Sequence, residues 1–176
     1  MNPGSPAKNG GVRLEITTED ISRLLTQYGD MVLRISYAYL KNQADAEDVS
    51  QDVFLKLMDK KPAFHDKTHE KSWLIRTTIN MCKNKVGLFW NKNRCAIDAV
   101  PEESRWDHYR SDDFVRDAVM SLPEKYRILI HLYYYEGFST PELAKLTNQR
   151  EATVRSSLHR ARERLKEILK EEYDFE

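Results

Sequence analysis

The sequence predicts an all-α fold with two helical domains, and three observations lead to this prediction. Glycine and proline number only six each in 176 residues, whereas an all-β chain needs many of both for its turns. Apolar residues recur three and four positions apart along most of the chain, which is helical spacing. This periodicity stops between residues 91 and 111, where acidic and polar residues dominate. We therefore expect a flexible linker there, between a first and a second domain.

The first domain is expected to span residues 17–90, after a loose N-terminal tail at 1–16 that is rich in glycine, asparagine and proline. Helical apolar spacing runs over residues 18–40, where Gly29 is expected to divide the stretch into two helices. Asp45 is suited to begin the next helix as its N-cap, because a short carboxylate accepts hydrogen bonds from the unpaired amides of a first turn.

A loop and a third helix complete the first domain. Residues 61–68 contain Pro62 and no apolar period, which predicts a loop. Residues 70–86 regain helical spacing, and Trp73 and Leu74 are among the residues that we expect to be buried there. The first domain is thus predicted to be a small helical bundle.

The second domain is expected to span residues 112–172 and to be helical as well. Pro123 ends its first helix, because a proline ring cannot continue a helix from within. Residues 124–136 form a strongly apolar and aromatic segment that ends at Gly137. An aromatic stripe at this spacing is far more typical of a core than of a ligand site.

The end of the second domain has the pattern of a helix-turn-helix. Ser139 and Glu142 form a capping box that begins a short helix, and a longer helix follows over residues 151–170. Ala144 is small enough to let the two helices approach closely. The outward face of the longer helix then carries side chains that can reach phosphates and base edges in a major groove. These side chains are Arg155, Ser156, His159 and Arg160.

The formal net charge of zero is an average over segments of opposite sign. Residues 71–94 contain six basic side chains and no acidic one, and residues 145–166 contain seven basic against two acidic. Residues 45–52 contain four acidic side chains and no basic one. Two basic segments separated by acidic ones predict two anion-binding faces on one chain. On charge alone, two solvated helix faces account for the pattern equally well.

The basic helix of the first domain is suited to hold a single strand of nucleic acid. Polar side chains without an acidic neighbour share one face of it, and they are Arg76, Asn80, Lys83 and Asn84. Trp73 starts this stripe beside the loop, where aromatic and basic groups can stack on an unpaired base. A plain core position is the alternative for Trp73. The acidic helix would repel DNA, so we expect it to bind a protein with a basic surface.

Several classes of protein are disfavoured. No apolar run approaches the length that spans a bilayer, and the first ten residues lack the apolar core of a signal peptide. We therefore expect a cytoplasmic protein without membrane contact of its own, and we expect no cofactor. Cys82 and Cys95 do not form a disulfide framework or a zinc site, and a redox role for either is left open. A metal enzyme built on His65, Asp66 and His69 is disfavoured, because no fourth ligand or activated nucleophile converges on that loop.

Two stretches of the sequence resemble a known family. DAEDVSQDVFLKLM at 45–58, followed by Phe64 and by KSWLIRTTINMCKNK at 71–85, resembles the second conserved region of extracytoplasmic-function sigma factors, a group of the sigma-70 family. LPEKYRILIHLYYYEGFSTPELAKLTNQREATVRSSLHRARERL at 122–165 is similar to their fourth conserved region. The resemblance implies an alternative sigma factor, not an enzyme, that directs promoter-specific initiation by RNA polymerase.

The resemblance also implies roles for individual residues. Core RNA polymerase would dock its β′ clamp helices on Asp45, Glu47, Asp48, Gln51 and Asp52. The minus-10 promoter element would be melted and held by Phe64, His65, Asp66, Lys67, Trp73, Arg76, Asn80, Lys83 and Asn84. The minus-35 element would be read by Arg155, Ser156, His159 and Arg160. The further partners that the family implies are the β flap of the polymerase and a dedicated anti-sigma factor.

A few positions depart from the family pattern. Met58 stands where an aromatic residue is common, Asn148 replaces the usual turn glycine, and Ser157 lacks the basic side chain often seen there. Asparagine tolerates a left-handed backbone, so we expect the turn to survive. These departures affect the choice of promoter more than the activity. The alternative function is a helix-turn-helix regulator that acts without docking on polymerase, for which the acidic helix would be dispensable.

Overall fold

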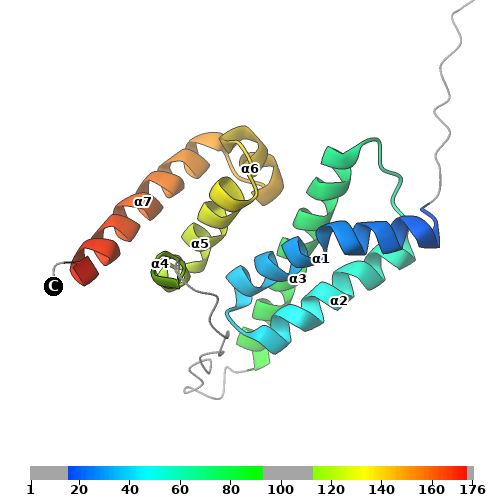
Figure 1. Cartoon of the computed structure of the whole chain (residues 1–176), viewed down its shortest axis with the longest axis horizontal. Helices are drawn as coiled ribbons and strands as arrows, with labels where there is room; N and C mark the ends of the chain where they lie inside the picture. Colours follow the sequence, from blue (N-terminus) through cyan, green and yellow to red (C-terminus); the bar gives the residue numbers. More distant parts are fainter. Residues whose placement is uncertain (1–15, 93–112, 174–176) are drawn as a thin grey trace, which may run out of the picture.

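Helices form every regular element in residues 16–92 and 113–173, which is the part of the chain that the structure, a computed structural model, describes. The prediction of an all-α chain in two helical parts is confirmed (Figure 1). The first lobe consists of α1 (Thr18–Leu40), α2 (Gln43–Lys60) and α3 (Lys67–Lys92). The second lobe consists of α4 (Asp113–Ser121), α5 (Glu124–Ile130), the π-helical turn η1 (His131–Tyr135), α6 (Thr140–Thr147) and α7 (Glu151–Tyr173).

The first helix, α1, is continuous, so the expected break at Gly29 is wrong. A capping box fixes its start, because Thr17 Oγ1 accepts from the Asp20 amide at 3.2 Å and Asp20 Oδ2 accepts from the Thr17 amide at 3.0 Å. One glycine costs a helix only about 1 kcal/mol. Leu24 and Ile35, on either side of the glycine, are fully buried, and burying each side chain contributes about 1.5–3 kcal/mol. Tertiary packing therefore outweighs the local preference.

The start of α2 also differs from the expectation. Asn42, rather than Asp45, is the N-cap, and Asn42 Oδ1 accepts a hydrogen bond from the Asp45 amide at 2.9 Å. Asp45 lies in the first turn instead, where the positive end of the helix dipole favours a carboxylate. Both residues thus stabilise the same helix end, three positions apart.

The third helix, α3, is longer than the apolar spacing indicated. It runs from Lys67 to Lys92, whereas the spacing predicted a helix over 70–86. No proline follows residue 86 in this stretch, so backbone hydrogen bonding continues after the apolar pattern has ended. Residues 91 and 92 of the expected linker therefore belong to α3. The rest of that linker, Cys95 and residues 1–15 of the expected tail lie outside the described residues.

The first lobe is held by an apolar core between α1, α2 and α3 and by ion pairs at its edges, one of which joins α1 to α3. The two terminal nitrogens of the Arg23 guanidinium in α1 donate hydrogen bonds to the Glu70 carboxylate in α3, at 3.2 and 2.7 Å. A bidentate pair of this kind fixes orientation as well as distance. The most deeply buried side chains of the lobe include Leu24, Val32, Ile35, Val53, Leu57, Leu74 and Ile75.

In the second lobe, α7 packs against α4, α5 and α6. The aromatic segment is a core element as predicted, but its helix widens at its end. η1 replaces the last α-helical turn, and the Glu136 amide donates to the His131 carbonyl at 3.3 Å. Gly137 follows with a φ of 74°, and the Phe138 amide returns to the Leu132 carbonyl at 3.1 Å. Single π turns of this kind are frequent at functional sites.

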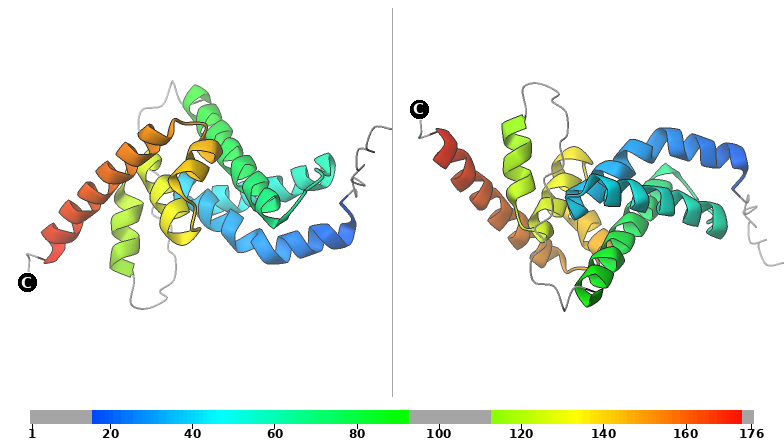
Figure 2. Two further views of the ribbon diagram at one scale, coloured as in Figure 1. Left: turned by 90° about the horizontal axis from the view of Figure 1, so that it is seen from above. Right: turned by 90° about the horizontal axis from the view of Figure 1, so that it is seen from below.

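The two lobes pack directly on each other. α5 lies against α1 and α6 lies against α3, as the views from above and below also show (Figure 2). Buried apolar side chains of both lobes belong to one continuous cluster. Within the described ranges, no helix is both long and apolar enough to cross a membrane.

Replacing Gly29 or Gly137 by alanine is expected to change the free energy of unfolding in opposite directions. Gly29→Ala is expected to raise the free energy of unfolding by about 0.5–1 kcal/mol, because the new Cβ would lie 3.7 Å from Leu25 Cδ1, an ordinary contact. Gly137→Ala is expected to lower it by about 1–2 kcal/mol, because the residue is left-handed although the space around it is open. Urea denaturation of both variants measures the difference. Equal effects of the same sign would contradict the account.

Candidate nucleic-acid interface

The second lobe contains the predicted helix-turn-helix. Glu142 Oε2 accepts hydrogen bonds from the amide and the hydroxyl of Ser139, at 2.8 and 2.6 Å, and so fixes the start of α6. Asn148 ends α6 with a φ of 55°, the left-handed turn that its side chain tolerates. The Gln149 amide then donates to the Ala144 carbonyl at 2.9 Å, and the chain turns into α7. The side chains that join α6 to α7 are buried, among them Leu143, Ala144, Val154 and Leu158.

The predicted recognition residues share the exposed face of α7. Arg155, Ser156, His159 and Arg160 are all exposed. Arg155 pairs with Glu151, and the Ser156 hydroxyl donates to the Thr153 carbonyl at 3.0 Å. Arg160 reaches the hydroxyl of Tyr126. Burial raises the pKa of that phenol, but Arg160 and Lys125 outweigh this effect and the pKa is lowered overall.

The polar stripe on α3 is formed as the spacing predicted. Arg76, Asn80, Lys83 and Asn84 are exposed. The opposite side of the helix is buried, and its residues include Leu74, Ile75, Ile79 and Cys82. Burial also raises the pKa of the Cys82 thiol to about 12, which keeps it protonated and unreactive at neutral pH.

The loop before α3 places an aromatic pair at the start of this stripe. Phe64 contacts Trp73 edge-on, with ring centroids 6.0 Å apart, and both are half-buried. Phe64 also meets the ring of His69 at 5.5 Å, and His65 stacks on His69 at 5.2 Å. The structure thus brings the loop, the aromatic pair and the basic helix together. The exposed members of the predicted set in this loop are His65, Asp66 and Lys67.

Asp66 has a structural partner in addition to its predicted role. Its Oδ1 accepts a hydrogen bond from the His69 amide at 2.7 Å, and its carbonyl accepts from the Glu70 amide at 3.1 Å. This is the geometry of a helix N-cap. Among the described residues, no group of three or more histidines, cysteines or acidic residues is placed to hold a metal ion.

The acidic surface of α2 is partly neutralised by α3. Lys85 Nζ lies 2.8 Å from Asp45 Oδ1 and 3.2 Å from Asp48 Oδ2. Burial lowers the pKa of Lys85, but the two carboxylates outweigh this effect and hold the pKa above its usual value. Glu47 accepts from the Gln43 amide group at 2.9 Å. The other two predicted docking residues, Gln51 and Asp52, are exposed.

An apolar groove that the sequence did not lead us to expect lies beside this acidic surface. The groove has a volume of about 490 Å³ and lies between α1 and α2. Leu25, Leu55 and Met58 line it and are 51%, 60% and 48% exposed. The sequence contained a signal for this groove. Adjacent residues of a helix point about 100° apart, so Leu25, which directly follows the buried Leu24, points away from the side of α1 that Leu24 occupies.

Two segments of the chain match models of one family. Residues 24–87 match Sigma-70 region 2, and residues 115–165 match Sigma-70, region 4. The first range contains the acidic surface of α2, the loop and the α3 stripe. The second contains the helix-turn-helix.

Two relatives come from different bacteria. The ECF RNA polymerase sigma factor SigE of Mycolicibacterium smegmatis is 29% identical over 160 residues, which cover 83% of this chain and 60% of that protein. The RNA polymerase sigma factor SigV of Bacillus subtilis is 28% identical over 144 residues, which cover 78% of this chain and 83% of that protein.

Two solved structures share the fold. The sigma factor RpoE of Bartonella quintana, in complex with the anti-sigma factor NepR, has a TM-score of 0.72 at 22% identity and covers 87% of this chain and 98% of that chain. CnrH, in complex with the cytosolic domain of CnrY, has a TM-score of 0.61 at 19% identity and covers 88% of this chain and 90% of that chain.

The helix N-cap formed by Asp66 gives a prediction about the stability of the fold. Asp66→Ala is expected to lower the free energy of unfolding by about 1 kcal/mol, because the His69 amide loses its acceptor. Asp66→Ser is expected to retain most of that stability, since a hydroxyl caps almost as well. Thermal denaturation of both variants measures the effect. Wild-type stability of the alanine variant would show that the cap is energetically unimportant.

Proposed function

We propose that this chain, which belongs to the extracytoplasmic-function group of the sigma-70 family of RNA polymerase sigma factors, binds core RNA polymerase and directs transcription initiation at its own promoters. The observation that carries the proposal is the presence, on one chain, of an acidic surface, a basic helix with an aromatic pair, and a helix-turn-helix. The family consists of transcription regulators and not of known enzymes.

The helix-turn-helix supplies contact with duplex DNA. Arg155 and Arg160 project from the N-terminal half of α7, where such side chains reach base edges in a major groove. An arginine that bonds guanine with both nitrogens contributes about 1–3 kcal/mol of discrimination. Arg155 would exchange its Glu151 partner for this contact. We assign the minus-35 element to this face, with Ser156 and His159 as its shorter donors.

The first lobe supplies strand opening at the minus-10 element. Extruding a base from a duplex costs a few kcal/mol, and stacking on an aromatic side chain returns about 1–3 kcal/mol per base. Phe64 and Trp73 form an edge-on aromatic pair that is half-buried, so part of their surface stays accessible to a base. Lys83, Asn80 and Asn84 continue along α3 and can hold the backbone of the opened strand.

We assign the docking on polymerase to α2. Glu47, Asp48 and Asp52 are exposed carboxylates that complement a basic partner. The apolar groove next to them, with Leu55 and Met58, adds area that is removed from water on binding. Electrostatic attraction and apolar burial thus act side by side on the same surface.

An anti-sigma factor is the remaining partner in the proposal. RpoE of Bartonella quintana and CnrH were both solved in complex with another protein, NepR and the cytosolic domain of CnrY respectively. The exposed apolar groove of α1 and α2 is the kind of surface that a second protein covers. A partner of this kind would compete with polymerase for the groove.

The acidic surface gives the direct test of this function. The variant Asp48→Arg/Asp52→Arg is expected to bind core RNA polymerase at least tenfold more weakly than the wild type, because two attractive charges become repulsive. Fluorescence anisotropy with labelled protein and purified core enzyme measures the affinity. Glu167→Arg/Glu171→Arg on the far end of α7 is the matched control, since both carboxylates are exposed there.

Two outcomes would decide between the proposal and its alternative. Sub-micromolar binding that the α2 variant loses and the α7 control retains supports a sigma factor. An intact chain that does not bind core polymerase, yet binds duplex DNA specifically, would favour a helix-turn-helix regulator that acts without docking.

A further inference from the structure

Glu151 is an acidic residue at the start of a basic helix. It is the first residue of α7, the helix that the proposed function places in a major groove. Residues 145–166 contain seven basic side chains against two acidic ones, and Glu151 is one of these two. The N-terminal residues of a recognition helix are the ones that contact base edges. DNA phosphates repel a carboxylate at this position, so a favourable contact is needed to offset that repulsion.

Two side chains hold the Glu151 carboxylate in the free chain. Its Oε1 accepts a hydrogen bond from the hydroxyl of Thr140, the first residue of α6, at 3.2 Å. The same oxygen accepts from the Arg155 guanidinium, one turn further along α7. The Thr140 contact therefore joins the first residues of both helices of the helix-turn-helix. It keeps the carboxylate beside Arg155, one of the predicted recognition residues.

The pair of Glu151 and Arg155 is accessible to DNA. The side chain of Glu151 is 37% exposed and that of Arg155 is 68% exposed. Ion pairs of this exposure contribute little to stability, because water screens them. A base in the groove can therefore replace one partner of the pair at low cost.

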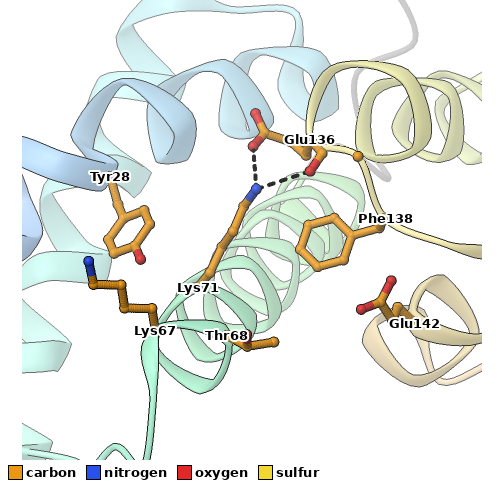
Figure 3. Close-up of a pocket in the computed structure, with 8 residues that line it drawn as sticks. Tyr28, Lys67, Thr68, Lys71, Glu136, Phe138 and Glu142 are labelled. Atoms are coloured by element: carbon orange, nitrogen blue, oxygen red, sulfur yellow. Dashed lines mark hydrogen bonds and ion pairs between the residues drawn. The ribbon is translucent and has the colours of Figure 1, made fainter.

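The carboxylate of Glu142, near the start of α6, has a different environment. It accepts hydrogen bonds from the amide and the hydroxyl of Ser139, which cap its own helix. It also lines a pocket of about 230 Å³, together with Lys67 and Lys71 of α3 (Figure 3). Glu142 is thus engaged in capping, whereas Glu151 is held next to a residue that the proposed function assigns to DNA.

The chemistry of base edges indicates which base suits Glu151. Guanine presents two acceptors, O6 and N7, which can take Arg155 away from its carboxylate partner. The carboxylate then needs another donor. Cytosine presents an N4 amino group in the major groove and no acceptor there. Adenine also has an amino donor, but its N7 acceptor lies beside it and repels a carboxylate. Cytosine is therefore the base that a carboxylate accepts best.

We propose that Glu151 is a specificity-determining residue that accepts a hydrogen bond from the N4 amino group of a cytosine when Arg155 moves to guanine. This inference rests on the proposed function in one respect, the binding of duplex DNA by α7. Thr140 is the positioning residue, because its hydroxyl keeps the carboxylate in place after Arg155 has left. At other bases the carboxylate gains no donor and is still repelled by phosphates, which penalises wrong sites.

Modified cytosines test this contact atom by atom. The full-length chain first selects its preferred site from a duplex library with about ten randomised base pairs, one turn of DNA. Each cytosine of the selected site is then replaced in turn by N4-methylcytosine or by 5-methylcytosine. In a paired duplex the N4 methyl group takes the place of the major-groove donor, whereas the 5-methyl group adds bulk to the same edge and leaves the donor. Fluorescence anisotropy gives the affinity for each duplex.

At one cytosine, the wild type is expected to bind the N4-methyl duplex about fivefold or more weakly than the 5-methyl duplex. Glu151→Ala is expected to lose this difference. It is also expected to bind a scrambled duplex at least as tightly as the wild type, because a charge that repels phosphates is gone. Glu163→Ala is the matched control, since it removes an exposed carboxylate from the same helix and is expected to keep the difference.

Three results would overturn the proposal. They are a selected site without a cytosine that depends on its amino group, a difference that persists in Glu151→Ala, and an equal weakening of every duplex by Glu151→Ala. The last result would show that Glu151 only supports the fold of α7. Failure of the proposed function appears separately, as a wild-type chain that does not bind core polymerase although the effect of N4-methylcytosine still depends on Glu151.

Discussion

The buried guanidinium of Arg127 is the interaction on which the arrangement of the two lobes depends. It belongs to α5, yet it satisfies carbonyls at the end of α1 and just after α4. Leaving a buried charge without its partners is strongly destabilising, so these hydrogen bonds tie the end of α1 to the second lobe. They act together with the apolar cluster that continues from one lobe to the other.

The charges of the chain complement each other inside the molecule before any partner binds. Lys85 of α3 is paired with Asp45 and Asp48 of α2, and Lys71 of the first lobe is paired with Glu136 of the second. The net charge of zero therefore reflects neighbouring surfaces of opposite sign and does not exclude a nucleic-acid partner. Because these carboxylates would compete with phosphates for the same cations, we expect the free chain to bind DNA weakly by itself.

Local signals in the sequence predicted the helix-turn-helix and the α3 stripe, because both depend on residues a few positions apart. The capping box of Ser139 and Glu142 and the left-handed Asn148 are of this kind. The contact between the two lobes was not predictable in this way, since Arg127 and the Ala38 carbonyl are 89 positions apart. The expected helix break at Gly29 was wrong for a related reason. Burial of side chains on either side of Gly29 in α1 outweighs the low helix propensity of one glycine. The groove was not predicted because it depends on α1 and α2 lying side by side, which the spacing within one helix does not show.

The most direct test of how the two lobes are held together is the distance between their far ends in the free chain. Spin labels at Ser22→Cys on α1 and Lys170→Cys on α7, in a Cys95→Ser background, report it by pulsed electron resonance. Cys82 is buried with a raised thiol pKa and does not label. The start of α1 and the end of α7 lie at opposite ends of the molecule (Figure 1). We therefore expect one long and narrowly distributed distance in the wild type, and a broad distribution in an Arg127→Gln variant, which loses donors to the carbonyls at the end of α1. A broad distribution in the wild type, or an unchanged narrow one in the variant, would contradict this explanation.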